Sequence, residues 1–232
     1  MREIVLDTET TGLDPKTGDR IVEIGCVELF NMLPTGNNYH VYINPERDIP
    51  QEAFRVHGLS AVFLSDKPVF SQIHKEFLDF IGNESNIIIH NAEFDMRFIN
   101  SEFERLGIPP IRKERIIDTL LIARKKHPGA SNSLDALCKR YGIDNSKRTQ
   151  HGALLDSEIL AEVYLELRGG RQTIFELKTE KQKPKIANVF QSNFDRNRKL
   201  ALRLDENDFA RHQKLVESMK GKSIWSKYKL GE

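Results

Sequence analysis

The sequence predicts a mixed α/β fold in which helices pack on a single sheet. Three short segments rich in β-branched residues, at 2–7, 20–29 and 38–44, read as strands joined by the turn-like segments DPKTGD and LPTGNN. Connections this short favour an antiparallel meander. From residue 68 onwards, helix-like and strand-like segments alternate, which is typical of a sheet with helices packed against it.

The alternating half of the chain supplies the remaining elements in order. Apolar residues at helical spacing predict helices at 68–82, 93–107, 133–142 and 152–170, and the helix TLLIARKK follows the short strand RIID. NIIIH, at 86–90, is the other predicted strand. Gly107, followed by Pro109 and Pro110, ends the second of these helices.

The composition is that of an ordinary soluble protein. Hydrophobic residues make up 39% of the 232 residues and charged residues 30%. The longest apolar runs are too short to span a bilayer, and no N-terminal signal pattern is present. Cys26 and Cys138 lie within strand-like and helix-like patterns, without metal-ligand spacing. We therefore expect reduced core thiols in a cytoplasmic protein.

The net charge of +1 conceals an uneven distribution of charge along the chain. Residues 1–177 carry 21 basic and 27 acidic side chains, whereas residues 178–232 carry 14 basic and 7 acidic ones. An acidic body is poorly suited to hold nucleic acid by neutralising phosphates alone. If this body acts on nucleic acid, another source must supply positive charge.

Two carboxylates end the first predicted strand, in the stretch IVLDTETTGL. Because strand side chains alternate between faces, Val5, Asp7 and Glu9 point the same way. Two acids side by side repel each other, which raises their pKa values unless a cation neutralises them.

Two predicted helices also carry an acid on their apolar stripe. Asp95 lies three residues before Phe98, and Asp156 lies three residues before Ile159. A buried acid is costly unless it is paired or binds a cation. For either Asp alone, a helix N-terminal charge or a salt bridge is the simpler interpretation. Four such acids together favour a shared hard cation, Mg²⁺ or Mn²⁺, and paired metals are a known device for phosphodiester cleavage.

His151 lies five residues before Asp156, just ahead of the last of these helices. On its own it is simply a loop or helix-entry histidine at the surface. Beside a cluster of acids it becomes a candidate general base, because its unperturbed pKa lies near neutral.

These five residues, in this order, resemble the signature of the DEDDh 3′–5′ exonucleases. The signature begins with Asp7-x-Glu9 and continues with Asp95 in HNAEFD. It ends with His151 and Asp156 in HGALLD. Longer stretches, including NNYHVYINP, EAFRVHGL and SLDALCKRYGIDNSKRTQHGALLDSEILAEVYL, are similar to proofreading subunits of bacterial replicative DNA polymerases within that family. The similarity is close over residues 2–170 and looser at the extreme C-terminus. It implies a ribonuclease H-like fold: a five-stranded mixed sheet flanked by helices, here followed by a flexible C-terminal tail.

The resemblance implies a role for each residue of the signature. Asp7, Glu9 and Asp156 would bind the first of two Mg²⁺ or Mn²⁺ ions, and Asp7 would hold the second together with the substrate phosphate. Asp95 would complete the cluster through water, and His151 would deprotonate the attacking water. The enzyme would release the 3′-terminal nucleotide of DNA as a 5′-monophosphate. Mispaired ends would be preferred because a mismatch costs less to unpair.

The resemblance also implies a pocket for the terminal nucleotide. Glu52 and His57, in EAFRVHGL, match positions that contact this nucleotide, and the backbone of Thr10–Gly12 would lie nearby. His57 equally fits a turn residue before Gly58. Asp118 matches a recurrent family acid outside the metal set, and we expect it to be structural. The implied substrate-binding residues are Asp7, Glu9, Glu52, His57 and Asp156.

The chain is expected to comprise an exonuclease domain at 1–177, a linker at 178–203 and a polymerase-binding segment at 204–232. The charged, Pro-containing TEKQKPK predicts the linker, and 204–220 has weak helical amphipathicity. By resemblance, the tail would bind the polymerase alpha subunit, with Ile224 and Trp225 as anchors. Composition alone favours a disordered basic tail.

Gln172, Phe175 and Leu177, in RQTIFEL, resemble a sliding-clamp-binding peptide. The same letters also fit a last segment that packs on the domain, and the pattern alone does not decide between them. The resemblance leaves a small third core subunit open. It implies a replisome-associated protein of the bacterial cytoplasm, without membrane contact.

Two other functions compete with a proofreading exonuclease. A DEDDh exonuclease acting on RNA ends is disfavoured by the linker and basic tail, because such relatives are usually little more than a catalytic domain. A non-catalytic polymerase-binding scaffold is disfavoured because all four acids and His151 are present.

Overall fold

The structure is a computed structural model that describes residues 1–146, 148, 150–169 and 206–218. The chain divides into two units, Met1–Thr179 and Glu180–Glu232. In the second unit the described residues form helix α8 (Glu206–Ser218), which lies within the helix predicted at 204–220. The predicted linker, the clamp motif and the tail anchors lie outside the described residues.

The first unit is built on a five-stranded mixed sheet with the strand order β3-β2-β1-β4-β5. Its strands are β1 (Arg2–Thr10), β2 (Ile21–Phe30), β3 (Leu33–Tyr42), β4 (Asn86–Ile89) and β5 (Ile116–Asp118). The first three form the predicted antiparallel meander, whereas β4 runs parallel to β1 and β5 parallel to β4. The fold prediction is therefore confirmed, and β1, which carries Asp7 and Glu9, is the central strand.

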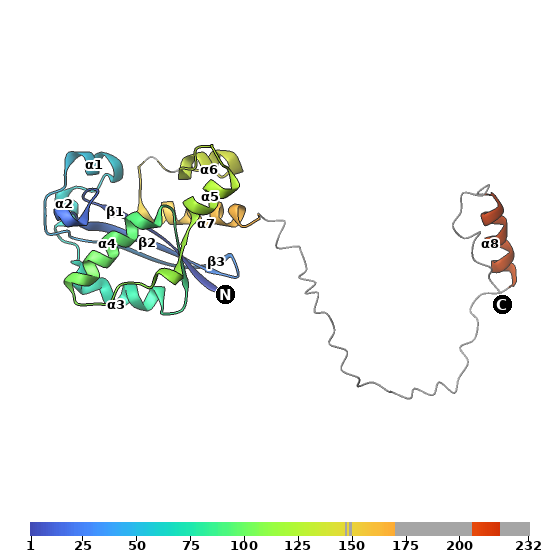
Figure 1. Ribbon diagram of the computed structural model, residues 1–232, viewed down its shortest axis with the longest axis horizontal. Coiled ribbons are helices and arrows are strands. Elements are labelled where there is room, and N and C mark those ends of the chain that lie inside the picture. The colour runs from blue at the N-terminus through green and yellow to red at the C-terminus, as the bar shows by residue number, and fades with distance from the viewer. Residues whose placement is uncertain (147, 149, 170–205, 219–232) are drawn as a thin grey trace, which may run out of the picture. The chain divides into compact units, whose positions relative to one another are not determined.

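Helices flank this sheet (Figure 1). They are α1 (Gln51–His57), α2 (Ala61–Leu64), α3 (Phe70–Ile81), α4 (Ala92–Arg105), α5 (Thr119–Lys126), α6 (Leu134–Tyr141) and α7 (Ala153–Leu167). One buried core joins α3 and α4 to Ile4 and Leu6 of β1, and a second joins α5, α6 and α7 to Val5. The alternation of Ile4, Val5 and Leu6 between the two cores shows that successive β1 side chains face opposite sides.

Asp118 ties the starts of two helices together. Its carboxylate accepts hydrogen bonds from the Leu120 amide (2.8 Å), which caps α5, and from the Asn91 and Ala92 amides (3.2 and 3.3 Å) at the start of α4. These contacts satisfy amides that have no partner within their own helix. They agree with a structural role for Asp118.

The structure corrects one predicted turn. Residues 33–38, expected to be turn-like, belong to β3, and the chain reverses at Asn31 and Met32, whose φ angles are 51° and 66°. Pro34 favoured the turn prediction because proline breaks central strands. β3 is an edge strand, where a residue without an N–H is tolerated.

Helices α1 and α2 were not predicted. α1 buries only His57, and α2 has four residues, so neither produces an apolar period in the sequence. Cys26 and Cys138 are both free and buried, as expected. Within the described residues, no helix is long and apolar enough to cross a membrane.

Candidate active site

The acids of the signature meet at the C-terminal end of β1. Asp7 and Glu9 come from this strand, and Asp95 and Asp156 come from the first turns of α4 and α7. Asp95 is 3% exposed and Asp156 2% exposed, which confirms that both lie on inward-facing stripes. Ligand atoms of Glu9, Asp156 and His151 all lie within 4.8 Å of one another. The structure thus brings together residues that are almost 150 positions apart in the chain.

Hydrogen bonds to β1 fix the position of Asp95. Its Oδ1 accepts from the Thr8 amide (3.1 Å) and from the Thr8 hydroxyl (2.7 Å). Thr8 points to the opposite side of the strand from Asp7 and Glu9, so it joins α4 to β1 beside the acids. The sequence analysis did not identify Thr8.

The acids raise one another's pKa values. Burial, followed by the charges of Asp95, Glu9 and Asp156, raises the pKa of Asp7 well above its usual value. Burial and the charge of Asp156 raise the pKa of Glu9 to about 8, and burial raises that of Asp95 to about 7. Burial is the largest cause for all three acids, and the repulsion that the sequence analysis expected adds to it for Asp7 and Glu9.

Asp156 differs because Arg148 lies against it. Arg148 donates from Nε and Nη2 to the two oxygens of Asp156, at 2.6 and 2.8 Å, and from Nη1 to Asp135 (2.7 Å). Burial would raise the pKa of Asp156, but hydrogen bonds from His151 and Arg148 outweigh it and hold the pKa below its usual value. Sequence reasoning missed Arg148, although the need for positive charge beside four acids pointed to such a residue.

His151 lies at the open side of the cluster. Its side chain is 47% exposed, and its Nδ1 lies 3.1 Å from Asp156 Oδ2 and 2.8 Å from Arg148 Nη2. Its backbone amide donates to the Val56 carbonyl (3.1 Å), which ties the loop before α7 to α1. A solvent-facing imidazole within reach of buried carboxylates has the position that a general base requires.

A cavity of about 620 Å³ opens beside Glu9. Its lining includes Thr10 at the end of β1, the turn from Thr11 to Leu13, and Glu52 and His57 of α1. The residues that the resemblance associated with a terminal nucleotide therefore share one cavity with an acid of the cluster.

His57 presents one polar atom in this cavity's wall. Its Nδ1 accepts from the Leu59 amide (3.0 Å), so the neutral ring carries its proton on Nε2. Nε2 is buried and makes no hydrogen bond of ordinary geometry with the described residues, although the Thr10 backbone is close enough to raise the pKa of the ring slightly. Burial lowers the pKa of His57, which keeps the ring neutral near pH 7. A buried donor without a partner is costly, which fits a group that hydrogen-bonds a ligand.

This donor set suits a hard divalent cation. Buried carboxylates repel one another, and oxygen ligands are those that such cations prefer. An acid cluster of this kind at the end of a central strand, with a histidine at its edge and a cavity beside it, is typical of metal-dependent phosphodiester hydrolysis.

Comparison with known proteins places the chain in a family. The model of the exonuclease family RNase_T matches residues 4–164. DNA polymerase III subunit epsilon of Rickettsia conorii is 56% identical over 180 residues, covering 76% of this chain and 78% of the relative. The Escherichia coli protein of the same name is 44% identical over 236 residues, covering 97% of both chains.

Solved structures agree with this placement. Exonuclease X in complex with 5′ overhanging duplex DNA has a TM-score of 0.57 at 28% identity and covers 71% of this chain and 89% of its own. The nuclease domain of 3′hExo, a DEDDh family member bound to rAMP, has a TM-score of 0.63 at 20% identity over 72% of this chain and 91% of its own, which shows the shared fold.

The chain therefore belongs to the exonuclease family, with the ribonuclease H-like fold of its DEDDh members. Within that family it groups with the epsilon subunits and is a 3′–5′ proofreading exonuclease. Divalent metal ions are the cofactors typical of this family.

Proposed function

We propose that Asp7, Glu9 and Asp156 would hold two divalent metal ions, Mg²⁺ or Mn²⁺, and that Asp95 would complete this acid cluster. The main support is the excess of buried negative charge: the pKa values of Asp7, Glu9 and Asp95 are all raised, and Arg148 pairs directly with Asp156 instead. When bound, the ions supply the positive charge that phosphodiester hydrolysis requires.

His151 then acts as the general base. It is exposed, so its ring can reach a water molecule, and Asp156 lies within hydrogen-bond distance of Nδ1. A proton on Nδ1, donated to Asp156, leaves Nε2 free to accept the proton of the attacking water. The imidazolium formed in this way is stabilised by the same carboxylate.

The cavity beside Glu9 receives the 3′-terminal nucleotide of DNA. Glu52 and His57 line it, and the unpartnered Nε2–H of His57 supplies a hydrogen-bond donor for the nucleotide. Only an unpaired end enters, so mispaired termini are selected because they fray at lower cost. The product is a nucleoside 5′-monophosphate.

We further propose that the protein works as a subunit of the replicative polymerase in the bacterial cytoplasm. Support comes from relatives named DNA polymerase III subunit epsilon, one of which is matched over 97% of both chains. Residues 1–177 form the exonuclease domain, 178–203 the linker and 204–232 the segment that binds the polymerase alpha subunit. Gln172, Phe175 and Leu177 are proposed to contact the sliding clamp.

The variant Asp7→Asn tests the catalytic proposal. It should abolish the Mg²⁺-dependent release of 5′-monophosphates from single-stranded DNA and raise the melting temperature of the metal-free protein, because it removes a repelled buried charge. Asp79→Asn, on an exposed carboxylate of α3, is the matched control and should change neither property. Metal-dependent activity retained by Asp7→Asn would refute the site. Turnover of an RNA oligonucleotide of the same sequence, measured in parallel, decides between DNA and RNA ends.

A further inference from the structure

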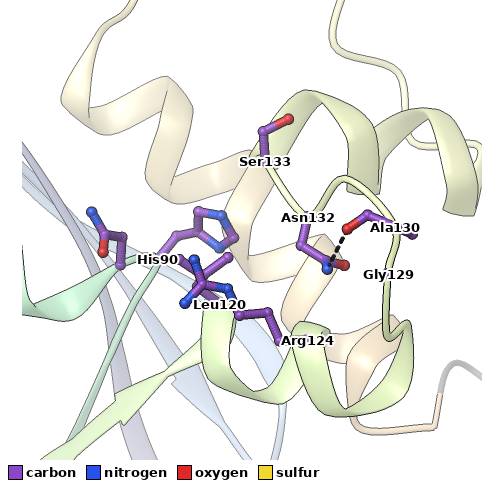
Figure 2. A pocket seen from close by; sticks show the side chains of 8 residues that line it. His90, Leu120, Arg124, Gly129, Ala130, Asn132 and Ser133 are labelled. Carbon is purple, nitrogen blue, oxygen red and sulfur yellow. Dashed lines mark hydrogen bonds between the residues drawn. The ribbon is translucent and has the colours of Figure 1, made fainter.

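A second cavity, of about 560 Å³, lies outside the site described above. It opens between the turn after β4, the first turns of α5 and the loop before α6 (Figure 2). Its walls include His90 and Asn91 from the turn, Arg124 from α5, and Asn132 and Ser133 from the loop. None of these residues takes part in the proposed catalysis.

Arg124 supplies the charge of this cavity. It is exposed, and no ion pair or hydrogen bond joins it to another of the described residues. No residue of the lining carries a carboxylate. The nearby carboxylate of Asp118 is already engaged by three backbone amides. The cavity thus presents a guanidinium that is free to bind an anion, in a protein body that is otherwise acidic.

The loop before α6 adds hydrogen-bonding groups. Ser133 caps α6, so the partial positive charge at the start of this helix of eight residues lies at the cavity wall. Asn132 is 8% exposed, and its Nδ2 donates to the carbonyls of His127 and Ala130. Its Oδ1 is buried and has no partner among the described residues. A water that donates to this oxygen and to a phosphate oxygen would satisfy it.

The cavity adjoins the acid cluster through Asn91. This residue has a φ of 65° and immediately precedes α4, whose Asp95 lies four residues further on. Four residues of helix span about 6 Å, so the cavity lies next to the place where the phosphodiester is cut. The nucleotide pocket beside Glu9 has a separate set of lining residues.

We propose that this cavity binds a phosphodiester group of the substrate strand, upstream of the bond that is cleaved, through Arg124 and the start of α6. The inference rests on the proposed function, since it assigns a second contact to the same substrate. It explains how an acidic domain keeps hold of the strand that remains after each cleavage: the strand's next phosphates meet a positive site beside the acids. A mononucleotide has no upstream phosphodiester to place in this site.

The variant Arg124→Gln tests the proposal against a matched control, Lys125→Gln, which removes the same charge from the same helix outside the lining. Two substrates are compared in Mg²⁺: an octamer of thymidylate, and the p-nitrophenyl ester of thymidine 5′-monophosphate, which has no upstream strand. For Arg124→Gln, kcat/KM on the octamer should fall about tenfold, the loss expected for one charge-assisted hydrogen bond, with the ester unaffected. Its logarithmic salt slope on the octamer should flatten by about 0.7.

A neutral methylphosphonate placed at each internal position of the octamer then locates the contact. For wild type, a methylphosphonate at one position upstream of the cleaved bond should lower activity. For Arg124→Gln, the same methylphosphonate should cause no loss beyond that of the substitution itself. The proposed phosphodiester site would be overturned if Arg124→Gln lowered kcat/KM equally on the ester and the octamer. It would also be overturned if Lys125→Gln lowered kcat/KM on the octamer as much as Arg124→Gln does, or if no upstream methylphosphonate lowered the activity of wild type. Hydrolysis of both substrates by wild type tests the proposed function separately. The phosphodiester site is tested only by the ratio of kcat/KM between each variant and wild type.

Discussion

At the scale of single residues, Arg148 occupies the carboxylate that is proposed to bind metal, so we expect the arginine and the metal ion to compete for it. Arg148 donates to both oxygens of Asp156, and its Nη2 lies 2.8 Å from Nδ1 of His151. Because an arginine nitrogen only donates, Nδ1 either carries a proton and donates to Asp156 or accepts from Arg148, in which case the neutral ring carries its proton on Nε2. Such a ring has no free nitrogen to accept a proton. If His151 is the base, as proposed, we expect Arg148 to release Nδ1 first, so that this nitrogen can donate to Asp156 and leave Nε2 free.

The variant Arg148→Gln should bind Mn²⁺ more tightly than wild type, by about tenfold or more, because two adjacent unit charges near a surface interact by about 4 kcal/mol. The metal-free variant should lose about 3 kcal/mol of stability, since Asp156 is left buried without its partner. Titration calorimetry and thermal unfolding in chelator measure the two effects. Arg105→Gln, at the exposed end of α4, is the control. Unchanged Mn²⁺ affinity would contradict the competition.

Between pH 7 and 9, the metal-free protein should become less stable as pH rises. The pKa values of Glu9 and Asp95 are raised to about 8 and about 7, whereas both groups ionise near pH 4 in an unfolded chain. The native state therefore binds more protons than the unfolded state across this range. By linkage, the free energy of unfolding falls by up to about 1.4 kcal/mol per pH unit for each extra proton.

Thermal unfolding in chelator, at steps from pH 7 to pH 9, measures this slope. The pKa values of His57 and His90 are lowered, so these residues make the free energy of unfolding rise with pH. This effect is confined to pH values below about 6.5, outside the range from pH 7 to pH 9. Glu9→Gln should flatten the slope, and saturating Mg²⁺ should remove most of it. A melting temperature that rises with pH over this range would show that the acids are already compensated.

At the scale of elements, the position of α7 depends on its close approach to β2. Gly25 lies opposite Asp7 in the sheet, and a Cβ at this position would lie 2.2 Å from the backbone of α7 at Ala153. The hydroxyl of Ser157 donates to the Gly25 carbonyl (2.9 Å). Asp156 is the neighbour of Ser157, so this contact sets how near the α7 acid comes to the acids of β1.

The variant Gly25→Ala should push α7 away from the sheet, cost about 1–3 kcal/mol of stability and reduce kcat more than KM, because Asp156 moves relative to Asp7. Ser157→Ala removes only the hydrogen bond, leaves the close approach intact and should cost about 1 kcal/mol. Unfolding free energies and steady-state kinetics of both variants separate the two contributions. Equal losses in both would show that the hydrogen bond, not the close approach, positions α7.

Elements with a local period were predictable, and those without one were not. The stripes that place Asp95 and Asp156 inward, and the alternation that places Asp7 beside Glu9, follow from repeats of 3.6 and 2 residues. α1 has no such repeat because it buries only His57. The contact of Arg148 with Asp156 spans a loop without any period, so only the folded structure shows it. The cavity at Arg124 likewise depends on three segments that meet only in space.

At the scale of the whole molecule, charge and chemistry are divided between two parts of the chain. Residues 1–177 are net acidic and contain every residue of the proposed catalytic site, whereas residues 178–232 carry 14 basic and 7 acidic side chains. The sheet and both hydrophobic cores lie within Met1–Thr179. The described elements that position the proposed catalytic residues thus all belong to the first unit, and polymerase binding by residues 204–232 remains a proposal.

Truncation after Leu177 should leave hydrolysis of single-stranded DNA unchanged and abolish co-purification with the polymerase alpha subunit, because the site and its cores are retained and the proposed binding segment is lost. Full-length Trp225→Ala is the companion variant: it keeps the basic charge and removes a proposed aromatic anchor. If the tail instead held DNA by charge, truncation would weaken activity most at low salt, and Trp225→Ala would co-purify normally. Retained co-purification of the truncated protein would place the polymerase contact on the exonuclease domain itself.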